Sequence, residues 1–159
     1  MDRALPREDL RTLLDQVTRE ITQREAGIIL DAAELSRDGP EDETCTVYTS
    51  FDRGMDTSLS LRADTSMFVR LARGMMQTED LTPEDVEEVA KEYFNVLCGH
   101  VLSRLFQVTR LPARFSVPSF CRGRHVMEDN EDYIILNYIG DQNEWVQLIH
   151  HTPCGTGCC

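Results

Sequence analysis

A carboxylate and a carboxamide three residues apart are the side chains of this sequence best suited to chemistry. Glu92 and Asn95 are preceded by Glu88 and followed by Gly99, at spacings of four, three and four residues. On an α-helix, these spacings place all four residues in one stripe. A carboxylate can bind a cationic group through a charge-assisted hydrogen bond, and a carboxamide can hold a water molecule as donor and acceptor at once.

The chemistry of this stripe is limited by its neighbours. The stripe contains no nucleophile and no proton shuttle, and the sequence lacks the motifs of serine hydrolases, cysteine proteases, zincins and nucleotide-binding loops. The stripe therefore fits a role inside the active site of another molecule, where Asn95 would orient a water in line with a phosphorus atom. Such positioning is a large part of phosphoryl-transfer catalysis. The bare backbone of Gly99 would let that partner approach closely.

A long helix is predicted to carry the stripe, from Leu81 to Arg110, with about 25 residues. Thr82 is its expected N-cap, Pro83 fits the first helical position, and Asp85 completes a capping box. The face opposite the stripe is apolar and is predicted to pack on the core; its members are Val86, Val89, Ala90, Tyr93, Phe94, Leu97, Val101, Leu105 and Val108.

Any surface helix has a polar stripe, so the residue types in this one decide its interpretation. Asn95 is a poor helix former, and Gly99 costs about 1 kcal/mol relative to alanine within a helix. Both lie on the outward face, where packing gives no reason for them, which favours a surface kept for a partner. Leu102 and Phe106 continue this face and are a candidate docking ridge, unless neighbouring loops bury them.

Length and charge restrict the class of protein. The chain has 159 residues and a net charge of −12, which argues against nucleic acid or an anionic membrane as a partner. It has no apolar run of about 18 residues and begins with a charged segment, so we expect a cytoplasmic protein without a membrane span. We predict one domain over residues 1–151 and a cysteine-rich tail over residues 152–159.

The six cysteines fall into two groups. Cys45, Cys98 and Cys121 stand alone in apolar surroundings and are predicted to be buried free thiols. The tail contains the other three, which with two adjacent histidines form a candidate soft-metal site: His150, His151, Cys154, Cys158 and Cys159. Their spacing matches no standard zinc signature, so we favour an ordinary terminus and expect no metal site.

The rest of the chain predicts an α+β fold, with a mostly antiparallel sheet and two long helices packed on one face. A helix is expected over residues 7–26, a buried extended segment over 28–33, and a hairpin from strands at 44–51 and 57–62. A short helix capped by Asp64 or Ser66 should run to about Met75. Further strands are expected at 114–117, 133–139 and 144–151, the last as an exposed edge, with a polar loop at 121–130.

The first helix contains an echo of the stripe. Glu20, Gln23 and Gly27 form the pattern E-x2-Q-x3-G, which suggests two related halves and a degenerate second site. Glutamine is one methylene longer than asparagine, and a displacement of about 1 Å costs on the order of 100-fold in rate. At most one working site is therefore expected.

The E-x2-N-x3-G helix resembles the signature of the CheC/CheX/FliY family of chemotaxis phosphatases, and its single good copy is most similar to CheX. The order of elements also fits, over roughly residues 7 to 151. The resemblance implies hydrolysis of the phospho-aspartate of a CheY-type receiver, with Glu92 on the receiver's lysine and Asn95 on the water. It places Glu88 and Gly99 at the partner, puts Mg²⁺ on the receiver, requires no cofactor in this chain, and implies a homodimer.

Two positions depart from the family pattern. Glu88 replaces a residue that is often serine or aspartate, and His100 replaces an asparagine that usually follows the motif glycine. A non-catalytic adaptor that binds a signalling or flagellar partner is therefore the alternative function. A third possibility is an unrelated α+β domain whose stripe has no partner.

Overall fold

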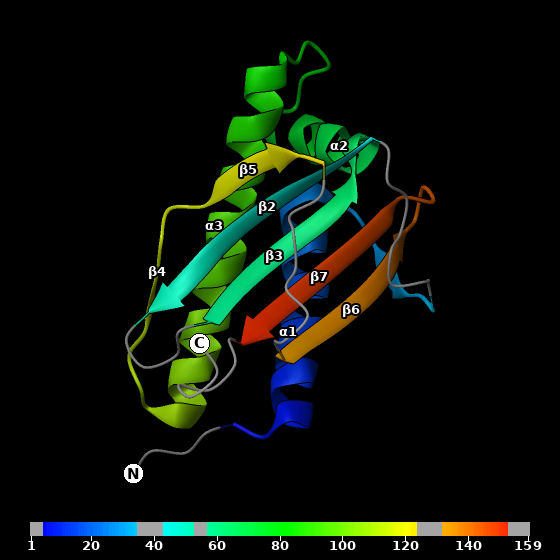
Figure 1. Cartoon of the computed structure of the whole chain (residues 1–159). Coiled ribbons are helices and arrows are strands. Elements are labelled where there is room, and N and C mark those ends of the chain that lie inside the picture. Colours follow the sequence, from blue (N-terminus) through cyan, green and yellow to red (C-terminus); the bar gives the residue numbers. More distant parts are fainter. Residues whose placement is uncertain (1–4, 35–42, 53–56, 124–131, 153–159) are drawn as a thin grey trace.

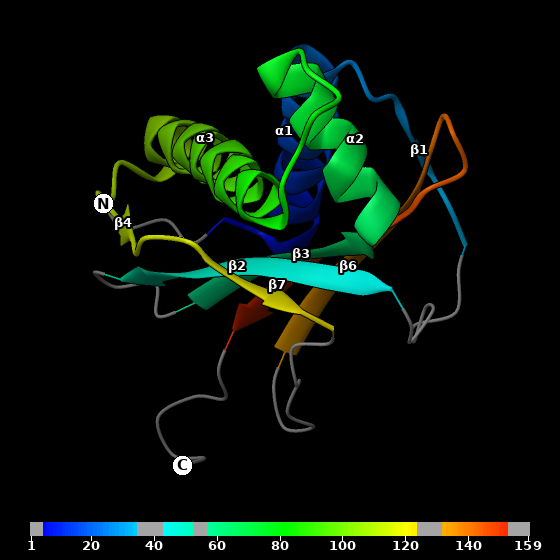
Figure 2. The same cartoon turned by 90° about the horizontal axis from the view of Figure 1, so that it is seen from above.

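The computed structural model describes residues 5–34, 43–52, 57–123 and 132–152. In these residues, three helices lie together on one face of a seven-stranded sheet (Figures 1 and 2). The helices are α1 (Arg7–Ala26), α2 (Thr65–Met76) and α3 (Pro83–Thr109). The strands are β1 (Leu30–Ala32), β2 (Thr44–Asp52), β3 (Thr57–Asp64), β4 (Arg114–Phe115), β5 (Ser119–Arg122), β6 (Asp132–Gly140) and β7 (Trp145–Thr152). The predicted α+β fold is confirmed, and the short α2 joins the two long helices on the covered face.

The sheet has the order β1-β6-β7-β3-β2-β4, with β5 also paired to β2, and every pairing is antiparallel. The hairpin predicted from β2 and β3 is present, with Val47 opposite Leu61 and Thr49 opposite Leu59. The prediction that residues 144–151 form an edge strand is wrong. β7 lies between β6 and β3, and both of its sides are hydrogen-bonded.

The predicted helix start of α3 is confirmed. Thr82 accepts a hydrogen bond from the Asp85 backbone, Asp85 accepts one from the Thr82 backbone, and Pro83 is the first helical residue. The helix ends where Arg110 adopts a left-handed conformation, φ 60°. Its buried side chains are Val89, Ala90, Tyr93, Phe94, Leu97, Cys98, Val101 and Leu105. Val108, predicted to be in the core, is 54% exposed because it lies in the last turn, where α3 extends past the core.

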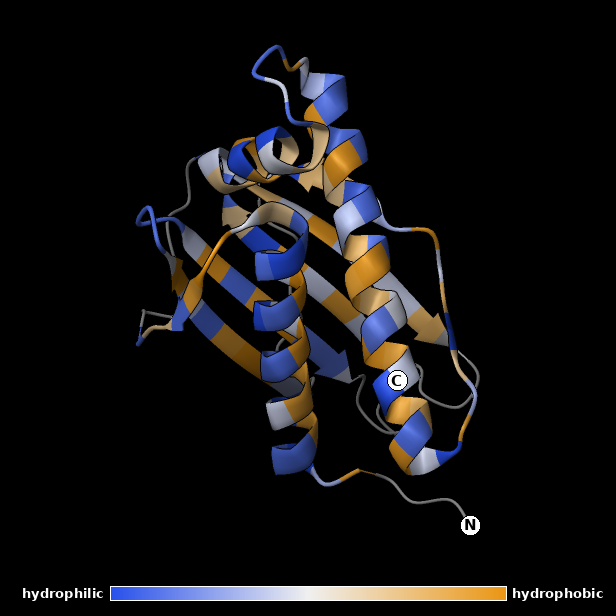
Figure 3. Cartoon of the chain, turned by 180° about the vertical axis from the view of Figure 1, so that it is seen from behind, coloured by the Kyte–Doolittle hydropathy of each residue, from blue (hydrophilic) through white to orange (hydrophobic). Residues whose placement is uncertain are grey.

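α1 packs beside α3, with the polar residues of both helices turned away from the sheet (Figure 3). A buried hydrogen bond of 2.6 Å joins the hydroxyls of Thr22 on α1 and Tyr93 on α3. The Thr22 hydroxyl also donates to the Thr18 carbonyl, so Tyr93 donates to Thr22. Burial raises the pKa of Tyr93, which keeps its hydroxyl protonated. This bond fixes the rotation of α3, and therefore the direction in which its outward face points.

Three local predictions need correction. The segment 28–33 is only partly buried, because Ile29 is 48% exposed and alternates with buried neighbours. Residues Ser119–Arg122 pair with β2 as β5, although the polar segment from residue 121 was predicted to be a loop; residues 124–130 of that segment are outside the described ranges. Neither Asp64 nor Ser66 caps α2 with its side chain, since the Asp64 carboxylate accepts from the Trp145 backbone instead.

Candidate functional site

The predicted stripe lies along the outward face of α3. Glu88, Glu92, Asn95 and Gly99 are all exposed, while the residues between them are buried or half-buried. At about 1.5 Å per residue, the stripe is about 17 Å long. A rigid helix of 27 residues, buried along its opposite face, therefore presents these four residues at fixed relative positions.

The side chains of Glu92 and Asn95 have no hydrogen-bond or ion-pair partner in the described part of the chain. Their polar atoms are available to another molecule without the loss of an internal contact. Gly99 is equally open, because a Cβ placed on it would meet nothing within 4 Å. Packing within the described part of the chain therefore does not explain the glycine, and its contact with a partner stays a prediction.

Glu88 differs from the other members of the stripe because a lysine lies beside it. Lys91 Nζ is 3.1 Å from Glu87 Oε2 and 3.9 Å from Glu88 Oε1. The Glu88 side chain remains 75% exposed, so this ion pair is weak. Lys91 nevertheless reduces the like-charge repulsion that Glu88 would exert on Glu92 one turn away.

His100, beside the stripe, contacts the neighbouring helix. The guanidinium of Arg24 on α1 is 2.9 Å from Nε2 of His100. Guanidinium has no acceptor, so Nε2 must accept and the imidazole proton is on Nδ1. In this arrangement the lone pair of His100 is occupied by Arg24, and His100 does not serve as a general base for the stripe.

The echo on α1 is not arranged like the stripe. Gln23 is exposed, but Arg104 donates a hydrogen bond to Glu20 Oε2 at 2.6 Å. This bond, together with the positive charge of Arg104, lowers the pKa of Glu20. The echo thus has the longer carboxamide, and its carboxylate is already paired.

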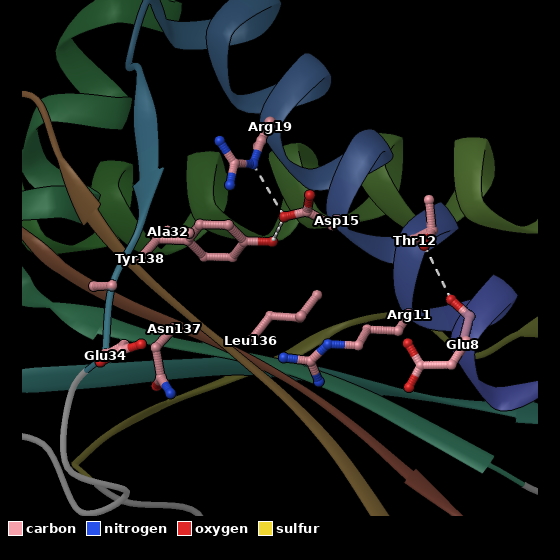
Figure 4. A pocket seen from close by; sticks show the side chains of 11 residues that line it. Glu8, Arg11, Thr12, Asp15, Arg19, Ala32, Glu34, Leu136, Asn137 and Tyr138 are labelled. Carbon is pink, nitrogen blue, oxygen red and sulfur yellow. Dashed lines mark hydrogen bonds and ion pairs between the residues drawn. The ribbon is translucent and has the colours of Figure 1, made fainter.

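The structure also contains a cleft that the sequence did not indicate, of about 560 Å³, between α1 and the β1–β6 edge (Figure 4). In it, Asp15 Oδ1 accepts from Tyr138 Oη at 2.6 Å and from Arg19 Nε at 3.0 Å. Arg19 also lies over the Tyr138 ring, 5.5 Å from its centroid. Burial and this bond to Asp15 raise the pKa of Tyr138. No stripe residue lines the cleft, so it is separate from the predicted site.

No cluster of three or more metal-binding side chains occurs in the described ranges. His150 and His151 follow each other in β7, where successive side chains point to opposite faces. The cysteines of the tail candidate, Cys154, Cys158 and Cys159, lie outside the described residues. Cys45 and Cys98 are buried free thiols as predicted, and Cys121 is half-buried. Burial raises the pKa of Cys98, which makes it an inert thiol.

Among the described residues, no helix is long and apolar enough to cross a bilayer. Comparison with curated protein sequences found no match. Solved structures with the same fold are CheX of Desulfovibrio desulfuricans (12% identity, TM-score 0.74, 91% of this chain and 99% of that one) and CheX of Vibrio vulnificus (11%, 0.72, 92% and 99%). A third is a complex of CheX with CheY, BeF3 and Mg²⁺ from Borrelia burgdorferi (11%, 0.69, 92% and 98%).

These likenesses show that the chain has the α+β fold of the three solved proteins. The family model described as chemotaxis phosphatase CheX matches residues 45–137, more than half of the chain. The chain therefore belongs to the CheX family. The matched range includes all of α3 and its stripe, and it excludes α1 with its echo.

Proposed function

We propose that this protein hydrolyses the phospho-aspartate of a CheY-type receiver, and that Glu92 and Asn95 carry out the reaction. The observation that supports this most directly is the pair of unpartnered polar side chains on the outward face of a rigid helix. Membership of the CheX family supports the reaction class. The solved complex of a CheX with CheY supports the choice of partner.

In the proposed reaction, α3 enters the receiver's active site. The Asn95 carboxamide accepts a hydrogen bond from a water and places its oxygen in line with the phosphorus atom. The water's oxygen bonds to phosphorus as the bond between phosphorus and the aspartyl oxygen breaks. The products are inorganic phosphate and the receiver's free aspartate, and the protons of the water pass to phosphate and solvent.

Glu92 would fix the position of the receiver relative to α3. Its carboxylate would pair with the receiver's active-site lysine, and a charge-assisted bond of this kind is about twice as strong as a neutral one. Glu88 and Gly99 would contact the receiver at either end of the pair. Mg²⁺ would be supplied by the receiver, as the composition of the solved CheX–CheY complex supports. No cofactor of this chain is needed in the proposal.

The adaptor alternative is favoured by one observation, the hydrogen bond that draws His100 to Arg24 at a position that usually has asparagine in the family. If that asparagine contributes to hydrolysis, this chain would bind a receiver without dephosphorylating it. The cytoplasmic location and the homodimer expected from the sequence belong to the same proposal. β7 cannot provide the dimer edge, because both of its sides are paired.

The test is the decay of a phosphorylated CheY-type receiver from the same genome, measured with wild-type protein and with Asn95→Ala and Glu92→Ala. Faster decay that either substitution removes would support the phosphatase, with circular dichroism as the control for folding. Because both side chains are exposed and unpartnered, and alanine is the better helix former, neither substitution should destabilise the fold. Binding of the receiver without faster decay would support the adaptor.

A further inference from the structure

Exposed apolar side chains of this molecule are concentrated near one end of the stripe. Six large hydrophobic residues are exposed in the described ranges, and four of them lie between positions 106 and 117. They are Phe106 (44%), Val108 (54%), Leu111 (39%) and Val117 (85%). The segment that joins β4 to β5 runs beside α3 on the side away from α1 (Figures 1 and 2). This connecting segment, to which Val117 belongs, therefore lies on the flank of the molecule formed by α3.

Phe106 belongs to the same helical face as the stripe. It follows Gly99 by seven residues and Asn95 by eleven, spacings that return to one side of an α-helix. At about 1.5 Å per residue, Phe106 is about 10 Å beyond Gly99. Leu102 lies between them and is half-buried. A partner that covers Asn95 and Gly99 and extends along the same side of α3 would therefore also contact Leu102 and Phe106.

The two ends of α3 differ in charge. The first half of the helix has five carboxylates, Glu84, Asp85, Glu87, Glu88 and Glu92, and a single lysine. The end of the helix is basic instead, because Arg110 follows its last turn; Arg104 is turned toward α1, where it is paired with Glu20. The Arg110 guanidinium is 6.0 Å from the centroid of the Phe106 ring. The partner surface that fits this face is basic at one end and apolar with acidic neighbours at the other.

We infer that Leu102 and Phe106 form a docking ridge for the phosphorylated receiver, whose apolar flank would cover Phe106 while its active site lies over Asn95. This inference rests on the proposed function. A second copy of this chain is the less suitable occupant, because pairing over Phe106 would extend over Gly99 and Asn95 and close the stripe. The docking ridge would raise affinity without touching the reacting atoms.

Phe106 should affect the binding of the receiver, whereas Asn95 should affect the rate of hydrolysis. Phe106→Ala should raise the receiver concentration at half-maximal rate by about tenfold, because covering an exposed phenyl ring contributes roughly that factor. The maximal rate should stay within about twofold of the wild type. Asn95→Ala should have the opposite effect, with the maximal rate lost and binding retained. Val108 is near Phe106 in the sequence but lines a groove with Thr12 and Leu13 of α1, on another side of α3, so Val108→Ala should change neither quantity. Ile29→Ala, which removes an exposed apolar side chain far from α3 in the sequence, should also change neither.

Binding is also measurable without turnover. The sequence has a single tryptophan, Trp145, which is only 5% exposed, so Phe106→Trp adds the responsive fluorophore. The titrant is a CheY-type receiver activated with BeF3 and Mg²⁺, with the wild-type chain plus receiver as the blank. Emission of the Phe106→Trp variant should shift to shorter wavelength on binding, and a Val108→Trp variant should not shift.

The outcomes separate the two proposals. Unchanged affinity and half-maximal concentration for Phe106→Ala, together with loss of turnover for Asn95→Ala, would overturn the docking ridge and leave the phosphatase intact. An emission shift without any accelerated decay would sustain the docking ridge and overturn the phosphatase. A dimer in sedimentation velocity that Phe106→Ala dissociates would show that a second copy occupies the surface, and would also overturn the inference.

Discussion

Arg104 on α3 donates a hydrogen bond of 2.6 Å to the carboxylate of Glu20 on α1. The two residues are far apart in the sequence, and their contact joins the helix of the proposed site to the helix of its echo. Four residues further along α1, Arg24 contacts His100, so two polar contacts line the boundary between these helices. The consequence for function is that the acidic group of the echo is already paired within the chain.

Restoring asparagine to the echo should therefore fail to restore a site. We expect Gln23→Asn, introduced into the inactive Asn95→Ala chain, to leave the decay of a phosphorylated receiver at its spontaneous rate. The reason is that Glu20 remains bound to Arg104, so no free carboxylate faces the receiver's lysine. The measurement is the receiver's phosphate lifetime at saturating protein. Accelerated decay in this double variant would show that the contact with Arg104 does not inactivate the echo.

Gly99→Ala should make the protein more stable and less active. A Cβ at this position meets nothing within 4 Å, and alanine is favoured over glycine in a helix interior by about 1 kcal/mol. We expect the free energy of unfolding in urea to rise by about 0.5–1 kcal/mol. Receiver dephosphorylation should fall, because the added methyl group lies where the partner is proposed to approach. Retained activity would remove the proposed role of Gly99.

Gly74→Ala is the matched control, because the same change in another helix should have the opposite sign. A Cβ on Gly74 would lie 2.9 Å from the carbonyl oxygen of Ala26, at the end of α1. This neighbour is backbone and cannot rotate away, so α1 and α2 would have to separate. We expect the free energy of unfolding to fall by about 1–3 kcal/mol despite the better helix former. An increase in stability would mean that the two helices separate at little cost.

Local signals explain which parts of this structure could be predicted. The start of α3 depends on Thr82, Pro83 and Asp85, which act within one turn, and the direction of the stripe follows from helical spacing alone. β5 was missed because a four-residue strand that includes Ser119 and Arg122 lacks a regular alternation of apolar and polar residues. Its strand conformation depends on pairing with β2, which is distant in the sequence.

Long-range geometry explains the other errors. The sequence pattern of residues 144–151 shows a strand but does not show how many neighbours it has, and β7 proved to be interior. Similarly, the pairing of Glu20 with Arg104 depends on how α1 and α3 lie against each other, which no local pattern specifies. The role of the stripe stays a prediction, because the proposed reaction would occur on a phosphoryl group of another molecule.

His150 should make the stability of the protein depend on pH. It is 4% exposed in β7, and its Nε2 has no hydrogen-bond partner among the described residues. Burial lowers its pKa from 6.5 to about 4, with smaller contributions from His151 and Arg7 that Asp132 opposes. The folded state therefore favours the neutral ring. Stability from this group is complete above pH 6.5 and declines as the pH falls toward 4.

The expected decline is up to about 3 kcal/mol, because one pKa unit corresponds to about 1.36 kcal/mol. The measurement is urea denaturation of the wild type and of His150→Leu between pH 7.5 and 4. Leucine fits the surroundings, since the positions across the sheet are Leu59 and Ile134. The variant should lose less stability than the wild type over this range. Parallel pH profiles would show that His150 is not the group responsible.

Arginines of α1 cover the outer edge of β6 and should prevent self-association through this strand. β1 pairs only with residues 138–140 of β6, so the outward carbonyls of Tyr133 and Ile135 lie beyond it. Arg7 donates to the first of these carbonyls, and Arg11 donates to the second at 3.3 Å. An unpaired edge is a template for another strand, and charged side chains placed on it prevent that pairing.

Arg7→Ala combined with Arg11→Ala should therefore promote association through β6, detected by sedimentation velocity as a larger species whose population grows with concentration. The net charge becomes more negative by two, from −12 to −14, and the added repulsion alone would oppose association. The control is Arg24→Ala combined with Arg73→Ala, which changes the charge equally and leaves the edge covered. Association in the control alone, or in neither variant, would contradict the proposal that Arg7 and Arg11 prevent strand pairing at the edge of β6. Association in the Arg7 and Arg11 variant alone would show that β6, and not the interior β7, is the strand through which copies of this chain can pair.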